Sequence, residues 1–177
     1  MNQLKIYRIH PEIEIPKFGT AQSACFDIAF NPAGKFTYDG FDRHNAPFYR
    51  NFGRDRDIKI MPFDRILVPT GLIFDIPEGH SVRIHSRSGL SLKKGLVLAN
   101  MEAVIDSDYT QETFLMLLNI SDNPHYIAPG DRLAQAELVQ SLSYELVDTT
   151  DAPTQKTDRV GGLGSTGVSS KKKKETT

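Results

Sequence analysis

The chain has 177 residues, of which 39% are hydrophobic and 24% charged, a composition typical of one soluble globular domain that buries a core. Its net charge of −1 gives no broad electrostatic attraction, so we expect neither a nucleic acid nor a membrane as partner. The single Cys25 excludes an intrachain disulfide and a Cys-rich zinc site, and it favours a reducing, intracellular (cytoplasmic) setting.

The N-terminus lacks the apolar core of a signal peptide, and no apolar stretch approaches the roughly 20 residues of a membrane span. Runs rich in β-branched and aromatic residues predict strands within 4–9, 24–30, 58–61, 65–76, 80–86, 113–120, 132–140 and 143–147. The run 65–76 divides at Pro69–Gly71, and the nearly continuous apolar run 113–120 is typical of a strand covered on both faces. The spacing of the turns predicts an all-β sandwich or barrel, with one short helix over 88–95 that ends at Gly95.

Two segments stand apart from this pattern. Residues 31–56 carry aromatics and arginines without a clean period, which predicts a long loop or insertion. We expect its aromatics to pack onto the barrel domain, 1–150, although stacking on bases or sugars is the alternative.

Residues 151–177 have few apolar side chains and predict a flexible C-terminal arm with a Gly-rich motif. Its Lys171–Lys174 run is most simply a solvated tail.

Four short motifs carry residue types that suit chemistry on a phosphate. In "VIDSDYTQE", a β-hairpin would place Asp106 and Asp108 on one face, where carboxylates hold a hydrated Mg²⁺ or orient a water. The alternative is a turn with two solvated acids. In "HSRSGLS", Arg87 offers a fork of donors, Ser88 a hydroxyl and Gly89 close access to the backbone. The alternative there is a polar turn with Ser88 as a helix N-cap.

The other two motifs lie near the C-terminal end. In "PGDRLAQ", the amide of Gln135 falls on a strand and needs partners, either a ligand or a neighbouring loop. In "RVGGLGSTG", Ser165 and Thr166 stand among glycines with Arg159 upstream, which makes an anion clasp or a flexible linker. The stretch lacks the Lys of a Walker loop, and no helix follows it.

The order and spacing of five stretches, "SACFDI", "RSGL", "N-x5-D-S-D-Y", "GDRLAQ" and "GGLGSTG", resemble the five motifs of the homotrimeric dUTP pyrophosphatase (dUTPase) family. The resemblance covers about residues 4–167. It implies a jelly-roll-type β-barrel and a homotrimer with shared active sites, in which the C-terminal arm closes over the site of a neighbouring chain. It also implies hydrolysis of dUTP to dUMP and pyrophosphate, which lowers dUTP and supplies dUMP for thymidylate synthesis.

The resemblance implies a role for each matching residue. Asp106 corresponds to the acid that orients the water attacking the α-phosphorus, and Tyr109 to the ring that packs under the deoxyribose. Asp27 corresponds to the acid associated with a hydrated Mg²⁺. The remaining matches are substrate-binding: Arg87, Ser88, Gly89 and Gln135 at the phosphates; Asn100, Val104 and Ile105 at the uracil; Arg159, Leu163, Gly164, Ser165 and Thr166 in the arm. The histidines have no catalytic role in this interpretation.

The chain departs from the family pattern at several of these motifs. Cys25 and Ala103 stand where the family usually has Gly, and Ser86 where it usually has Pro. Thr110 and Gln111 replace the usual pair after the tyrosine. Leu163 replaces the aromatic that caps uracil, and Arg159 lies one residue nearer to the Gly pair than its family counterpart. These departures indicate a divergent branch, with a virus, and hence a host cell, as one possible origin.

Two alternatives to a strict dUTPase remain open. Ala103 and Leu163 motivate a related enzyme that also acts on dCTP, as hydrolase or deaminase. The 31–56 insertion motivates a dUTPase-fold binding or signalling protein that captures a partner through this segment.

Overall fold

The computed structural model describes residues 3–158 and 161–162 of the chain. It divides into two units, Met1–Ser143 and Tyr144–Thr177. The first unit carries every strand and the single helix that the described residues form. None of the described helices is long and apolar enough to cross a membrane.

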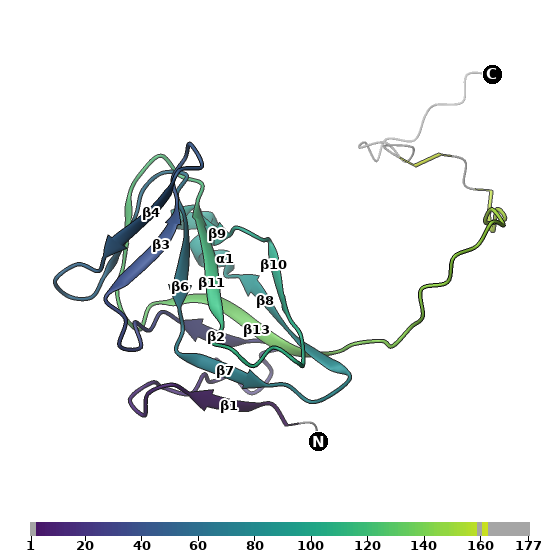
Figure 1. Ribbon diagram of the computed structural model, residues 1–177, viewed down its shortest axis with the longest axis horizontal. Coiled ribbons are helices and arrows are strands. Elements are labelled where there is room, and N and C mark those ends of the chain that lie inside the picture. Colours follow the sequence, from purple (N-terminus) through teal and green to yellow (C-terminus); the bar gives the residue numbers. More distant parts are fainter. Residues whose placement is uncertain (1–2, 159–160, 163–177) are drawn as a thin grey trace. The chain divides into compact units, whose positions relative to one another are not determined.

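Antiparallel sheets build the first unit (Figure 1). The largest has the order β4–β3–β6–β11–β9, with strands β4 (Pro47–Asn51), β3 (Thr37–Phe41), β6 (Arg65–Pro69), β11 (Phe114–Asn119) and β9 (Leu96–Leu98). A second has the order β10–β8–β13–β2, with β10 (Glu102–Ile105), β8 (His80–Ser86), β13 (Arg132–Gln140) and β2 (Phe26–Ala29). Two strand pairs complete the set, β1 (Lys5–Arg8) with β7 (Leu72–Asp75), and β12 (His125–Ile127) with β5 (Ile58–Ile60).

The core lies between these sheets because each strand turns alternate side chains inward. In the four-stranded sheet Ile28, Val82, Ile84, Ala134 and Ala136 are completely buried. Their sequence neighbours therefore point to the opposite side of this sheet, its outer face. In the view of Figure 1, β6 and β11 of the larger sheet run across β2 and β13 of the second sheet. The predicted all-β, jelly-roll-type barrel with one short helix is confirmed for the described residues.

The predicted short helix is α1 (Ser88–Lys94), and it ends where expected. Gly95 has φ +64° and its N–H donates to the carbonyls of Leu90 and Ser91, as is typical of a left-handed helix end. The alternative in which Ser88 caps the helix is wrong, because Arg87 is the N-cap residue and has no side-chain capping bond. Ser88 is the first helical residue.

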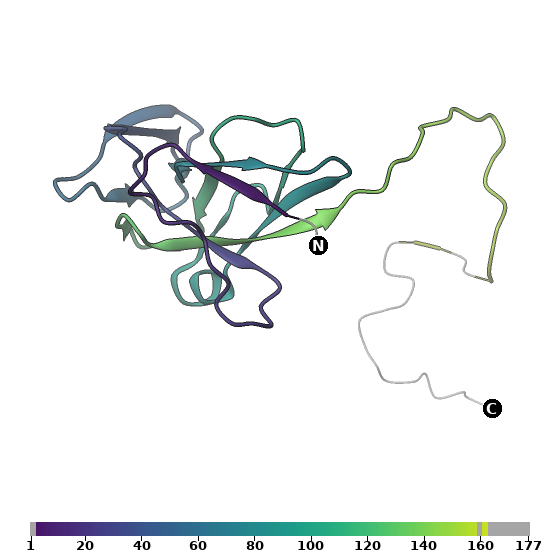
Figure 2. The ribbon, with the colours of Figure 1, turned by 90° about the horizontal axis from the view of Figure 1, so that it is seen from below.

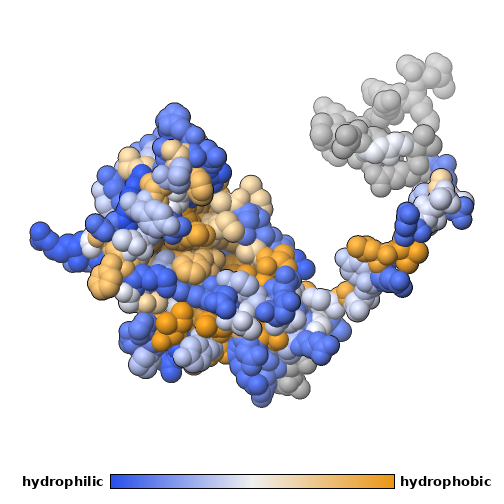
Figure 3. All heavy atoms as spheres, viewed as in Figure 1, coloured by the Kyte–Doolittle hydropathy of each residue, from blue (hydrophilic) through white to orange (hydrophobic). Residues whose placement is uncertain are grey.

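The expectation that β11 is covered on both faces is also wrong for the single chain. Its side chains alternate between buried and open, and Met116 is 46% exposed. In the view of Figure 3, apolar spheres gather in the middle of the unit, where Figure 1 shows β6, β7 and β11. The apolar run thus has one face in the core and one face without cover from the described residues.

The insertion 31–56 forms a hairpin, β3–β4, rather than a structureless loop. Asp42 closes it, because its Oδ1 accepts the N–H groups of His44 (2.8 Å) and Ala46 (2.9 Å). The bond from Ala46 lowers the pKa of Asp42, with the bond from His44 adding to it. Figure 2 shows the hairpin at one end of the unit and the β7–β8 turn at the other. The expected packing of the insertion's aromatics holds for Tyr38, which is buried in the core and whose ring stacks on Phe52, whereas Phe36, Phe41 and Tyr49 are exposed.

The strand expected over 143–147 is absent. Its residues form no ladder with any described strand, and Leu146 is 89% exposed. A strand is stable only against a partner strand, and within one chain this segment has none among the described residues.

Gly71, between β6 and β7, is a position where the backbone requires glycine. Its φ is +67°, and a Cβ there would lie 2.3 Å from Ile13 Cδ1. Gly79 has a similar φ, +73°, but a Cβ added to it would meet no atom within 4 Å. We expect Gly79→Ala to lower the free energy of unfolding by about 1 kcal/mol through strain alone, and Gly71→Ala by about 1–3 kcal/mol more through overpacking. Urea unfolding followed by circular dichroism measures both, and equal losses would contradict the crowding argument.

Candidate active site

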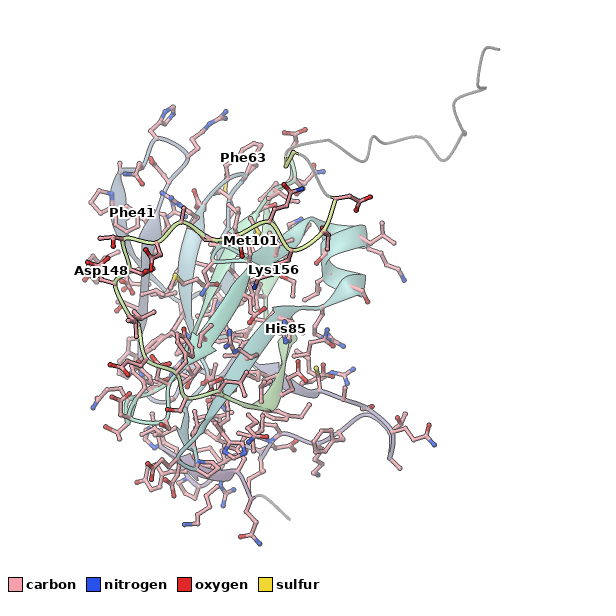
Figure 4. The ribbon with its side chains drawn as sticks, turned by 90° about the vertical axis from the view of Figure 1, so that its right-hand side faces the viewer. Phe41, Phe63, His85, Met101, Asp148 and Lys156 are labelled. Carbon is pink, nitrogen blue, oxygen red and sulfur yellow. The ribbon has the colours of Figure 1, made fainter. Side chains whose placement is uncertain are left out.

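One group of predicted site residues meets on the outer face of the four-stranded sheet. Asp27 on β2 stands opposite Gln135 on β13, which in turn stands opposite His85 on β8. His85 is labelled in Figure 4. Arg87 follows the end of β8 and reaches back over the same face. The sequence therefore brings an acid, an amide and a guanidinium together from segments far apart in the chain.

The carboxylate of Asp27 organises this group. Its Oδ1 pairs with Arg87 Nε and its Oδ2 with Arg132 Nη1, both at 2.9 Å. Arg87 Nη1 also donates to the main-chain oxygen of Arg132, at 2.7 Å. Two of the donors of Arg87 are thereby fixed, while Arg132 is 62% exposed and keeps donors toward solvent. We call Asp27, Arg87 and Arg132 the arginine–aspartate cluster. It carries one net positive charge, which suits an anion.

Gln135 and the start of α1 border this cluster. The Nε2 of Gln135 donates to the main-chain oxygen of Ser86 at 3.3 Å, so its partner is the neighbouring strand β8 and not a loop. Ser88 and Gly89 lie in the first turn of α1, and nothing lies within 4 Å of a Cβ placed on Gly89. A ligand can therefore approach the backbone there.

The fit of a magnesium ion depends on Asp27, the residue that the resemblance associates with the metal. No group of three or more His, Cys, Asp or Glu side chains able to hold a metal occurs in the described part of the chain. Both oxygens of Asp27 already pair with arginines, and each retains a further lone pair. This donor set does not form a metal cage. It fits a hydrated ion whose inner ligands are phosphate oxygens and water.

Cys25 and His85 are not poised for chemistry. Burial raises the pKa of the Cys25 thiol, and the charges of Glu137 and Asp27 raise it further, so the thiol stays neutral. His85 Nε2 lies 3.2 Å from Glu137 Oε1 in a structural pair on the outer face. That the histidines have no catalytic role stays a prediction.

The second group of predicted residues lies around β10. Val104 points to the outer face and is 46% exposed, whereas Ala103 and Ile105 pack against the core. Asn100 is exposed in the turn before β10. Asp106 directly follows the strand.

Of the two alternatives for Asp106 and Asp108, the structure shows the turn with two solvated acids and not the shared face of a hairpin. The chain turns after β10, and the N–H of Tyr109 donates to the Asp106 carbonyl at 3.1 Å. Both carboxylates are exposed on this turn. Tyr109 is 40% exposed, and its hydroxyl donates to the main-chain oxygen of Glu112 at 3.0 Å.

Within one chain the two groups do not meet. Ile105 stands opposite Val82 on β8, so Asp106 lies beyond the Val82 end of the segment 82–86. Arg87 follows the other end of this segment, at Ser86. Val82 and Ser86 are separated by about 13 Å along a strand. Asp106 also extends from β10 and Asp27 from β2, which are opposite edges of the sheet about 14 Å apart. Asp106 and the arginine–aspartate cluster are therefore far apart in the same chain.

The arm residues Arg159, Leu163, Gly164, Ser165 and Thr166 lie outside the described residues. Three functional candidates were missed by reasoning from the sequence: Arg132, Lys35 and Glu112. Arg132 stands within "GDRLAQ" and was visible as a charge beside Gln135. Lys35 and Glu112 pair across 77 positions, and no local pattern indicates such a contact.

Comparison with known proteins matches the same segments. The dUTPase family profile covers residues 54–167. A deoxyuridine 5'-triphosphate nucleotidohydrolase of Hydrogenobaculum sp. is 40% identical over 131 residues, covering 69% of this chain and 90% of that protein. The protein of the same name from Heliobacterium modesticaldum is 33% identical over 171 residues, covering 95% and 98%.

Solved structures show the same fold. The Staphylococcus bacteriophage 80alpha dUTPase with dUpNHpp superposes with a TM-score of 0.73 at 20% identity, covering 95% of this chain and all of that one. The dUTPase from Streptococcus mutans superposes with a TM-score of 0.60 at 24% identity, covering 84% of this chain and all of that one.

Proposed function

This chain belongs to the dUTPase family, and from that premise we propose that it hydrolyses dUTP to dUMP and pyrophosphate in active sites shared between copies of the chain. The relatives at 40% and 33% identity, both named for this activity, support the reaction. The observation that carries the shared site is the separation of Asp106 from the arginine–aspartate cluster. Both sets are present in each chain, and only a second copy brings one set to the other.

A homotrimer accounts for the surfaces that a single chain leaves open. Met116 on β11 and Val104 on β10 are about half exposed, as are other apolar side chains of the unit. Tyr144, Leu146 and Val147 expose an apolar segment that pairs with no described strand of the chain. Exposed apolar surface of this kind marks protein interfaces. A closed ring of three chains satisfies every copy equally.

In the proposed site, each described residue has a task that fits its surroundings. Arg87 presents a fixed guanidinium to the phosphates, next to the open backbone at Ser88 and Gly89. Asp106, exposed at its turn, aligns the attacking water, and Tyr109 packs under the deoxyribose. Gln135 lies close to the phosphates. We assign substrate binding also to Arg159, Leu163, Gly164, Ser165 and Thr166, which lie outside the described residues.

Asp27 would hold a hydrated Mg²⁺ through the water ligands of the ion, with phosphate oxygens as the direct ligands. Such an ion neutralises charge on the triphosphate. Hydrolysis of a phosphoanhydride depends mainly on charge neutralisation and an aligned water, so the site needs no covalent nucleophile.

Specificity for uracil follows from the backbone around Asn100, Val104 and Ile105. Backbone donors and acceptors there pair with the base, and cytosine presents the opposite pattern. Ala103 and Leu163 motivated the dCTP alternative. Leu163 lies outside the described residues, and Ala103 packs its side chain against the core, which supports selection of uracil.

We expect purified protein with Mg²⁺ to release pyrophosphate from dUTP with kcat/KM about 10⁴-fold higher than from dCTP, and to stop when the metal is chelated. One nucleotide panel, with products separated by chromatography, measures both rates and detects any deamination. Equal rates on dUTP and dCTP would contradict uracil selection, and absence of dUMP would contradict the hydrolase.

A further inference from the structure

The turn that carries Asp106 and Tyr109 is anchored by a buried acid, Glu112. Its side chain is 9% exposed, and each oxygen has a partner. Oε1 accepts the N–H of Gly71 at 2.9 Å, and Oε2 pairs with Lys35 Nζ at 2.5 Å. Lys35 also lies over the ring of Phe114, 5.4 Å from its centroid. A buried carboxylate with two such partners holds one position.

Glu112 is connected to the proposed sugar position through its main chain. Its carbonyl accepts the Tyr109 hydroxyl at 3.0 Å. The N–H of Tyr109 in turn donates to the Asp106 carbonyl, at 3.1 Å. The next residue, Thr113, is tied to the β6–β7 connection, because its carbonyl accepts the Thr70 hydroxyl at 2.6 Å. The C-terminal end of the turn is therefore firmly held, while the two residues at 110–111 within it are exposed.

Lys35 comes from the 31–56 insertion, so the insertion supports this turn. Removing its ammonium would leave the Glu112 carboxylate buried with one partner. Such a group leaves its site toward solvent, because an unpaired buried charge is strongly unfavourable. This displacement shifts the main chain at 112, and the Tyr109 ring moves with the carbonyl that its hydroxyl contacts.

We propose that Lys35 and Glu112 are positioning residues that set the selectivity for deoxyribose over ribose by holding the Tyr109 ring. This inference rests on the proposed function, in which that ring packs under the sugar. A ring in a fixed position leaves no space for a 2′-hydroxyl, whereas a loosened ring admits one. The insertion then acts in catalysis as part of the support of the site.

The test compares kcat and KM for dUTP and UTP in Lys35→Met and Glu112→Gln. We expect the ratio of kcat/KM for dUTP over UTP to fall by about 10- to 100-fold, as a displacement near 1 Å in a positioned group produces. Lys35→Arg retains the charge and should recover most of the ratio. Lys59→Met, at the exposed position of β5, is the matched control. Among the described contacts the Lys59 ammonium lies only over the Tyr126 ring, so this substitution should leave the ratio unchanged.

A double-mutant cycle tests whether Lys35 affects the selectivity through the hydroxyl of Tyr109. Tyr109→Phe removes the hydroxyl bond to Glu112, so Lys35→Met should add little to the loss of selectivity that Tyr109→Phe already causes. Independent, multiplying effects would overturn the proposal. A drop in rate that is equal for both nucleotides would also overturn it, since that is the result of a merely structural role.

Hydrogen exchange supplies a readout that does not depend on hydrolysis. The amides of Tyr109 and Thr113 should exchange faster in Lys35→Met than in Lys59→Met, because the anchor of the turn is lost. Unchanged exchange would overturn the anchor even in an active enzyme. Faster exchange in a protein that does not act on dUTP would contradict the proposed function and leave the anchor in place.

Discussion

Replacing Asp106 with Asn is expected to lower kcat for dUTP by about 10²- to 10⁴-fold. The amide has nearly the same shape as the carboxylate, but it neither accepts a proton from the attacking water nor carries the charge that aligns it. Asp106 is exposed on its turn and bears no structural ion pair among the described contacts. The free energy of unfolding should therefore change little, and KM should change less than kcat.

Asp108 provides the matched control for this substitution. It is a second exposed carboxylate on the same turn, two positions further along. We expect Asp108→Asn to keep kcat within about threefold of the unmodified protein, as exposed substitutions usually do. Steady-state release of pyrophosphate measures both variants. Similar losses in the two would show that the turn contributes general negative charge, and would contradict a specific water-orienting role for Asp106.

The strands of the barrel were largely predictable because they show the alternation of a half-buried sheet. The strands β8 and β13 lie where their patterns placed them, over 80–86 and 132–140. The hairpin of the insertion was missed for a physical reason. One of its buried positions is Gly40, where a Cβ would come 2.2 Å from the Arg65 carbonyl oxygen. Glycine permits this close approach of β3 to β6. Because it has no apolar side chain, it also interrupts the alternation of apolar and polar residues by which a strand is predicted.

The apolar runs 113–120 and 143–147 were predicted from composition, which does not specify the partner that covers them. In β11 one face is buried and Met116 is left open. No described strand pairs with the segment 143–147. A period-2 pattern indicates that a strand has an apolar face to bury. It does not indicate whether the partner that covers this face lies in the same chain or in another copy.

For the site, the sequence indicated residue types and not their pairing. Asp27, Arg87 and Gln135 were predicted individually, and the structure brings them together on the outer face. Arg132 was missed, although it provides the second ion pair of Asp27. Lys35 and Glu112 were missed because their contact depends on how the insertion folds back onto the β6–β7 connection, which local periodicity does not encode.

The central claim is that one active site takes Asp106 from one chain and Arg87 from another. Arg87→Ala should itself lower kcat/KM by about 10²-fold or more, because it removes a charge-assisted contact to phosphate and leaves Asp27 with one partner fewer. Each variant alone is thus expected to be nearly inactive. A mixture of the two is informative because each chain retains the group that the other lacks.

The most direct measurement is therefore the activity of Asp106→Asn and Arg87→Ala chains that have been unfolded, mixed in equal amounts and refolded together. In randomly mixed closed trimers, about a quarter of the sites pair an intact Asp106 with an intact Arg87. We predict recovery of about a quarter of the activity of the unmodified protein, with a maximum at equal amounts of the two chains. Activity that stays at the level of the separate variants at every ratio would contradict a site shared between chains.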